Sequence, residues 1–152
     1  MTTFTPLSPP ALTGAEIRAA VFQRLEKYNK LGFLEHFAMF MGMAQILEFG
    51  LKGLLLRKYG VEHEVTERWT LGKSGHELKA RGLRPDFCAL LESVVSYRNY
   101  IAHEILADHA LFASLSGRTS ARFEVRELEK ATYELEQRMF LHDWCEENNE
   151  WK

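Results

Sequence analysis

The segment that decides the fold is "FCALLESVVSYRNYIAHEILA", residues 87–107. Placed on a helical wheel at about 100° per residue, its apolar side chains gather on one face. The opposite face carries Glu92, Ser96, Asn99 and His103. The segment therefore predicts an amphipathic helix over about residues 86–107, beginning just after Pro85. Arg98 is an exception, because it falls near the middle of the apolar face.

The position of Arg98 requires a partner, since arginine is rarely buried unless it is paired. Glu48, an acid inside the strongly apolar segment 33–58, is a candidate. Asn99 and His103 are four residues apart on one face, so an amide–imidazole hydrogen bond between them is expected to set the histidine tautomer. Arg98 and His103 are five residues apart, which is about 140° around a regular helix. They can converge on one ligand only if the helix is distorted near Tyr100 or a second chain supplies the missing group.

The other segments also predict helices. Thr13 and Glu16 form a capping box that begins a helix over about 14–30. Residues 33–58 are apolar in nearly every direction, which predicts a buried helix in which glycines allow a neighbour to approach closely. A short helix is expected near 75–80, a loop over 109–119, and a last helix from about 120 to 146 with Glu134 and Arg138 paired on its outer face. We expect an all-α bundle of about four main helices, with an irregular arm at 1–12 and a single domain over 13–150.

Composition narrows the function classes. The 152 residues carry a net charge of −2, which does not indicate a general nucleic-acid binder. Residues 68–126 carry a net charge of +3 and residues 127–152 a net charge of −5. The lone cysteines Cys88 and Cys145 do not indicate a disulfide, and the first twelve residues do not resemble a signal peptide. The apolar run at 37–47 is too short to span a bilayer, so we expect no association with a membrane. The unpaired cysteines fit a reducing compartment, so we expect a cytoplasmic protein.

No metal or cofactor site is expected. The remaining histidines are scattered without ligand spacing, and "HEILA" at 103–107 lacks the second histidine of HExxH. The piece "GKS" at 72–74 lacks the preceding glycine and strand of a phosphate-binding loop.

The run "RNYIAH", Arg98 to His103, resembles the Arg-x4-His motif of HEPN domains (higher eukaryotes and prokaryotes nucleotide-binding). The apolar segment with an internal acid upstream, followed by "TLG" at 70–72, is similar to that family as well. The resemblance covers about residues 33–107.

The resemblance implies a homodimer of HEPN-like helical bundles in which the motif helices meet and cut RNA without metal. His103 would act as general acid or base, Arg98 would stabilise charge on the phosphate, and Asn99 would orient His103 or the phosphate. Glu48 matches a position at which some members keep an acid. Such proteins act as toxins or defence effectors.

Three alternatives follow from the same residues. The chain can be a non-catalytic HEPN-like bundle that binds a nucleotide or a partner protein in a toxin–antitoxin or defence system. Its acidic end also fits an immunity partner that inhibits a nuclease. Glu48 can simply pair with Lys52, four residues later.

In many toxins neutralised by a nucleotidyltransferase antitoxin, a tyrosine follows the motif histidine by two residues. Ile105 occupies that position here, which argues against this mode of neutralisation.

Overall fold

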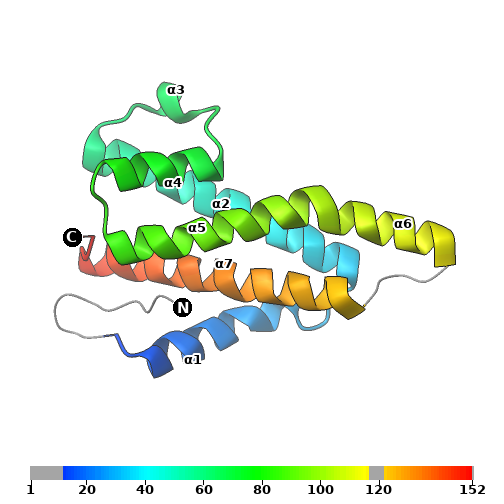
Figure 1. The fold of residues 1–152 in the computed structure, drawn as a ribbon. Coiled ribbons are helices and arrows are strands. Elements are labelled where there is room, and N and C mark those ends of the chain that lie inside the picture. Colours follow the sequence, from blue (N-terminus) through cyan, green and yellow to red (C-terminus); the bar gives the residue numbers. More distant parts are fainter. Residues whose placement is uncertain (1–11, 117–121, 152) are drawn as a thin grey trace.

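The computed structural model describes residues 12–116 and 122–151, and every regular element in these ranges is helical (Figure 1). The elements in chain order are α1 (Gly14–Leu25), the 3₁₀ turn η1 (Glu26–Tyr28), α2 (Phe33–Tyr59), α3 (His63–Thr66), α4 (Leu71–Ala80), α5 (Pro85–Tyr100), the π-helical turn η2 (Ile101–Ile105), α6 (Leu106–Ser116) and α7 (Arg122–Asn148). The predicted all-α class is confirmed. The predicted arm at 1–12 lies outside the described residues except for Leu12.

Local capping explains where the helices begin and end. The Thr13 hydroxyl accepts a hydrogen bond from the Glu16 amide, and the Glu16 carboxylate accepts one from the Thr13 amide, so the predicted capping box is confirmed. Thr70 caps α4 in the same way by accepting from the amide of Lys73. Gly60 ends α2 with a φ of 67°, a left-handed conformation that glycine adopts without steric cost.

Helix α7 is the centre of the bundle. It packs against α1, α2 and α5, while α4 fills the space between α2 and α5. Figure 1 shows α5, η2 and α6 running as one continuous rod beside α7, with α1 on the other side of α7. The fully buried apolar side chains come from α1, α2, α4, α5, η2 and α7, and include Val21, Phe40, Leu51, Leu55, Leu78, Phe87, Val94, Ile101, Ile105, Ala131 and Leu135.

Two glycines allow close helix packing. A Cβ atom on Gly50 would lie 3.3 Å from the His142 ring of α7, as expected for a glycine that lets a neighbour approach. A Cβ atom on Gly75 would lie 2.9 Å from Leu91 Cδ2, so this position holds α4 tightly against α5. The same expectation is wrong for Gly42, where an added Cβ would meet nothing within 4 Å.

Three predictions about the helices need correction. The helix over 86–107 continues through η2 and α6 to Ser116, so the loop predicted at 109–119 is wrong over its first eight residues. The short helix near 75–80 begins earlier, at Leu71. Helix α2 is not buried all round, because Ile46 and Phe49 are exposed on its outer face. With 27 residues it is also long and apolar enough to cross a membrane by length and composition, although its other face packs inside the bundle.

Arg138 was expected on the outer face of the last helix, but it is fully buried. Its Nη2 lies 4.0 Å from a Glu134 carboxylate oxygen, at the limit of an ion pair, and also donates to the Gln137 side chain. Nε and Nη1 have no hydrogen-bond partner in the part of the chain that the structure describes. Burial lowers the pKa of Arg138 to about 10. The pairing of Arg138 with Glu134 was predicted correctly, but the burial of Arg138 was not. The position of a residue on a helical wheel does not show which neighbouring helix covers it.

We expect Arg138→Met to raise the free energy of unfolding by about 1–2 kcal/mol. An apolar side chain of similar length removes a buried charge whose hydrogen bonds are incomplete, and the Glu134 carboxylate is not stranded, because its side chain is 20% exposed to water. Chemical denaturation of the parent and the variant measures the change. Arg138→Ala serves as the comparison and is expected to destabilise, because it leaves a cavity. A large loss of stability in Arg138→Met would show that the guanidinium makes a net favourable contribution.

Candidate active site

The two faces of α5 separate as the sequence predicts. Phe87, Leu90, Leu91 and Val94 are buried, and Ile101 and Ile105 continue this face into η2. Glu92, Ser96, Asn99 and His103 are all exposed. The candidate residues Asn99 and His103 therefore lie on an accessible surface of the rod formed by α5 and η2.

The helix that carries Arg98 and His103 is distorted directly after Tyr100. Residues Ile101–Ile105 form a π-helical turn, which contains more residues per turn than an α-helix, and His103 lies in its middle. The lower rotation per residue turns His103 toward the direction of Arg98, compared with the 140° offset of a regular helix. Single π turns within α-helices occur frequently at functional sites. Of the two alternatives, the distortion near Tyr100 is present within one chain, and the second chain stays a prediction.

Arg98 is half-buried and bonds to its neighbour. Its Nη1 donates to Oδ1 of Asn99 over 3.3 Å, in an exposed environment. Two expectations are therefore wrong. Arg98 is not buried in the apolar face, because its long side chain reaches from that face to the surface. The Asn99 amide oxygen faces Arg98 rather than His103. The His103 side chain is exposed and forms no hydrogen bond among the described residues.

Glu48 does not reach Arg98 within one chain. Its carboxylate lies 3.4 Å from Nζ of Lys52, one helical turn later, so the simpler reading of Glu48 is confirmed. Lys52 is itself buried, and its Nζ also donates to the backbone carbonyl of Glu67 over 3.3 Å. This pair ties α2 to the segment after α3. We assign Glu48 a structural role in the monomer.

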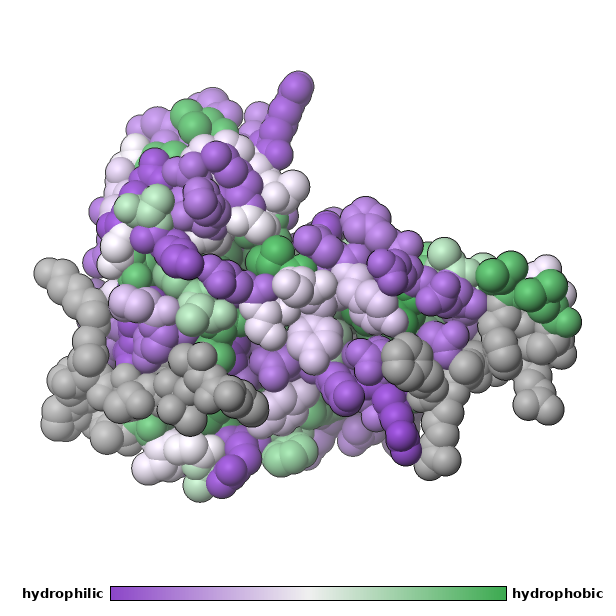
Figure 2. Space-filling model, in the orientation of Figure 1, coloured by the Kyte–Doolittle hydropathy of each residue, from purple (hydrophilic) through white to green (hydrophobic). Residues whose placement is uncertain are grey.

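A groove beside the motif was missed in the sequence. A cavity of about 500 Å³ between α5 and α7 is lined by Ser93, Ser96, Tyr97, Tyr100 and Glu127. Burial, and then the nearby carboxylates with Glu127 foremost, raise the pKa of Tyr100. Figure 2 shows hydrophilic and intermediate residues over this part of the molecule, whereas hydrophobic residues gather at the end of α6, where Leu111 and Leu115 are exposed. The sequence signal was the two tyrosines that flank Arg98 and Asn99.

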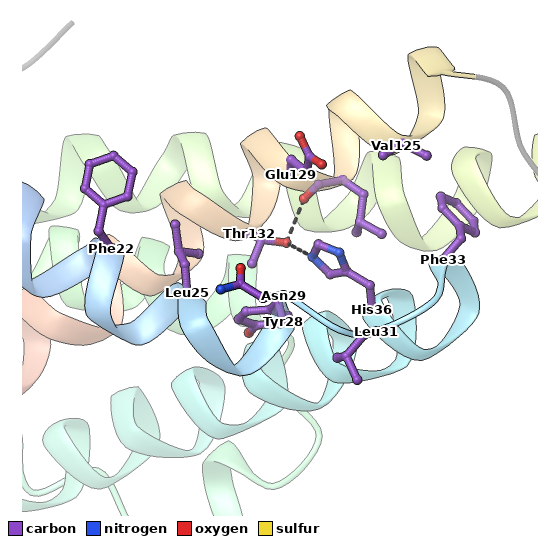
Figure 3. A pocket seen from close by; sticks show the side chains of 11 residues that line it. Phe22, Leu25, Tyr28, Asn29, Leu31, Phe33, His36, Val125, Glu129 and Thr132 are labelled. Atoms are coloured by element: carbon purple, nitrogen blue, oxygen red, sulfur yellow. Dashed lines mark hydrogen bonds between the residues drawn. The ribbon is translucent and has the colours of Figure 1, made fainter.

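The larger pocket lies elsewhere, among the end of α1, the start of α2 and α7 (Figure 3). It has a volume of about 640 Å³ and is lined mostly by apolar side chains, with His36 and Thr132 among its polar residues. The Thr132 hydroxyl donates to the Leu128 carbonyl over 2.6 Å, so it must accept from Nε2 of His36, which lies 2.8 Å away. The geometry requires a proton on Nε2, and burial lowers the pKa of His36.

A lowered histidine pKa makes stability depend on pH. Below about pH 6.5 the unfolded chain binds a proton at His36 that the folded chain resists, so the free energy of unfolding falls as the pH drops. We expect the free energy of unfolding of the His36→Asn variant to fall less than that of the parent when the pH is lowered from neutral to mildly acidic. Urea denaturation of both proteins across this range measures the difference. Equal slopes would show that other groups carry the pH dependence.

The described residues contain no group of three or more His, Cys, Asp or Glu side chains placed to hold a metal ion. Both cysteines are buried and unpaired with each other, and burial raises the pKa of Cys88 to about 11 and that of Cys145 to about 12. Neither thiol is therefore suited to act as a nucleophile near neutral pH.

Together, the structure brings Arg98, Asn99 and His103 to one accessible stretch around a π turn and leaves Glu48 with Lys52. Along this stretch, one chain presents one guanidinium and one imidazole. Comparisons with models of protein families, with characterised proteins and with solved structures found no match, so the HEPN assignment remains a proposal.

Proposed function

We propose that the protein is a metal-independent endoribonuclease of the HEPN type, acting as a toxin or defence effector in the cytoplasm. The observation that supports the proposal is the exposure of His103, in the π turn, and of Asn99, which bonds Arg98, while His103 forms no hydrogen bond among the described residues. The similarity of "RNYIAH" to the Arg-x4-His motif supplies the reaction class.

The reaction requires a base, an acid and a group that stabilises negative charge. In the proposed dimer, His103 of one chain removes the proton from the RNA 2′-hydroxyl, which attacks the adjacent phosphorus. The partner's His103 protonates the leaving 5′-oxygen. Arg98 from each chain stabilises the charge that develops on the phosphate oxygens. The products are a 2′,3′-cyclic phosphate and a 5′-hydroxyl, and no step uses a metal.

The test uses purified full-length protein and RNA in excess EDTA, with analysis of the product ends. Cleavage that leaves 2′,3′-cyclic phosphates supports the proposal. Mixing Arg98→Ala with His103→Ala tests the composite site, because the shared site of a mixed dimer keeps one histidine and one arginine, whereas each variant alone lacks both copies of one group. Partial activity in the mixture, above that of either variant alone, is expected. A parent protein that never cuts RNA would contradict the proposal.

Ligand binding without catalysis is the second candidate function, and the pocket in Figure 3 favours it. Its volume of about 640 Å³ lies within the usual range for small-molecule sites, about 300–1,000 Å³. Calorimetric titration with nucleotides separates the two functions. Binding that is lost in His36→Ala and retained in His103→Ala would assign the ligand to this pocket.

A further inference from the structure

The outer face of α2 carries an apolar seam that the bundle leaves uncovered. Its members are Met39, Gly42, Ile46, Phe49, Gly53 and Leu56, spaced alternately by three and four residues. Ile46 is 57% exposed, Phe49 70% and Leu56 41%. Alternating spacings of three and four mark the contact line of one helix against another in a coiled coil. The opposite face of α2 already packs into the core through Phe40, Leu47 and Leu51.

The seam is complementary to itself when one copy is reversed. In an antiparallel pair whose centre lies between residues 47 and 48, Ile46 faces the partner's Phe49, and Met39 faces the partner's Leu56. Gly42 then faces the partner's Gly53. An added Cβ on Gly53 would lie 2.8 Å from Nη1 of Arg57, so the Arg57 side chain covers this glycine and must turn away, toward the partner's Glu35, for the two backbones to approach. An added Cβ on Gly42 would meet nothing within 4 Å, so this position is open toward the outside. The six seam residues span about 26 Å of helix.

Charge at the two ends of the seam selects the antiparallel direction. Glu35 lies at its amino-terminal end and Arg57 at its carboxyl-terminal end, and no charged residue lies on the seam between them. An antiparallel pair places each Glu35 within one turn of the partner's Arg57, whereas a parallel pair places like charges together. Arg57 already pairs with Glu146 over 3.1 Å, but its side chain is 57% exposed and keeps free donors for a second carboxylate.

We propose that the outer face of α2 docks against the same face of a second copy of this chain in an antiparallel arrangement. The interface is distinct from the motif helix and does not rest on ribonuclease activity. If the motif helices also meet, the chains assemble through two kinds of two-fold contact. A helix of this length and composition also fits a lipid surface, and we favour the second copy because the seam spacing and the end charges match each other.

The first test is analytical ultracentrifugation of the full chain over a concentration series. Phe49→Glu is expected to weaken self-association about 30-fold or more, because it places two carboxylates at the centre of an apolar contact. Val65→Glu is the matched control, since Val65 is 56% exposed on α3. It is expected to associate as the parent does. Circular dichroism checks that both variants remain folded, and His103→Ala should also keep this association.

A charge exchange tests the direction. Glu35→Arg and Arg57→Glu should each associate more weakly than the parent, and a mixture of the two should form a mixed pair in which every end contact is again opposite in charge. A parent that remains monomeric, or that instead floats with anionic lipid vesicles, overturns the proposal. Equal association of Phe49→Glu and the parent, or a charge mixture that forms no mixed pair, overturns it as well.

Discussion

His103→Ala is expected to reduce RNA cleavage by about 10²–10⁴-fold, the range for removal of a general acid or base. In the proposed dimer the substitution removes both the group that deprotonates the 2′-hydroxyl and the group that protonates the leaving oxygen. The imidazole is exposed and forms no hydrogen bond among the described residues, so its loss should leave the thermal unfolding temperature unchanged. Single-turnover cleavage of a labelled RNA in EDTA measures the rate.

His76→Ala is the matched control for this measurement, because His76 is an exposed histidine on α4. It is expected to cut RNA at the parent rate. Arg98→Lys keeps the positive charge but loses the planar fork that contacts two phosphate oxygens. If charge alone mattered, this variant would cut as fast as the parent, and we expect it to cut more slowly. Equal rates for His103→Ala and the parent would remove His103 from the mechanism and leave ligand binding as the better proposal.

The sequence predicted the elements whose evidence is local. The capping box at Thr13, the bounds of α2 and the division of α5 into two faces depend on spacing along one helix, and all were confirmed. The need for a distortion near Tyr100 also came from helix geometry, because two residues five apart cannot share one face of a regular α-helix. The π turn at Ile101–Ile105 matches one of the two alternatives that this reasoning left open, and spacing could not choose between it and a second chain.

Features that depend on contacts between distant segments were not predictable. The wheel placed Arg98 in the apolar face but could not show that its side chain reaches the surface and bonds Asn99. A segment that is apolar in nearly every direction predicts a buried helix, whereas only one side of α2 packs against the bundle formed by the described residues. The pair of Lys27 and Glu136 joins residues 109 positions apart, and neither residue shows its partner in the sequence.

Lys27→Met is expected to lower the free energy of unfolding by about 3 kcal/mol, because it leaves the Glu136 carboxylate buried without its cation. Glu136 is completely buried, and both of its carboxylate oxygens accept from Lys27 Nζ over 2.6 Å. The ammonium also donates to the Arg24 carbonyl over 3.0 Å, which joins the end of α1 to α7. The melting temperature should fall by about 6–12 °C for a chain of this size.

The matched control is Lys130→Met, since Lys130 is 64% exposed and lies 3.6 Å from Glu127. Its loss should change stability by less than about 0.5 kcal/mol, as exposed ion pairs contribute little. Lys27→Met combined with Glu136→Leu should recover most of the lost stability, because the unpaired charge is then absent. A single variant as stable as the parent would show that water reaches Glu136 and replaces the ammonium.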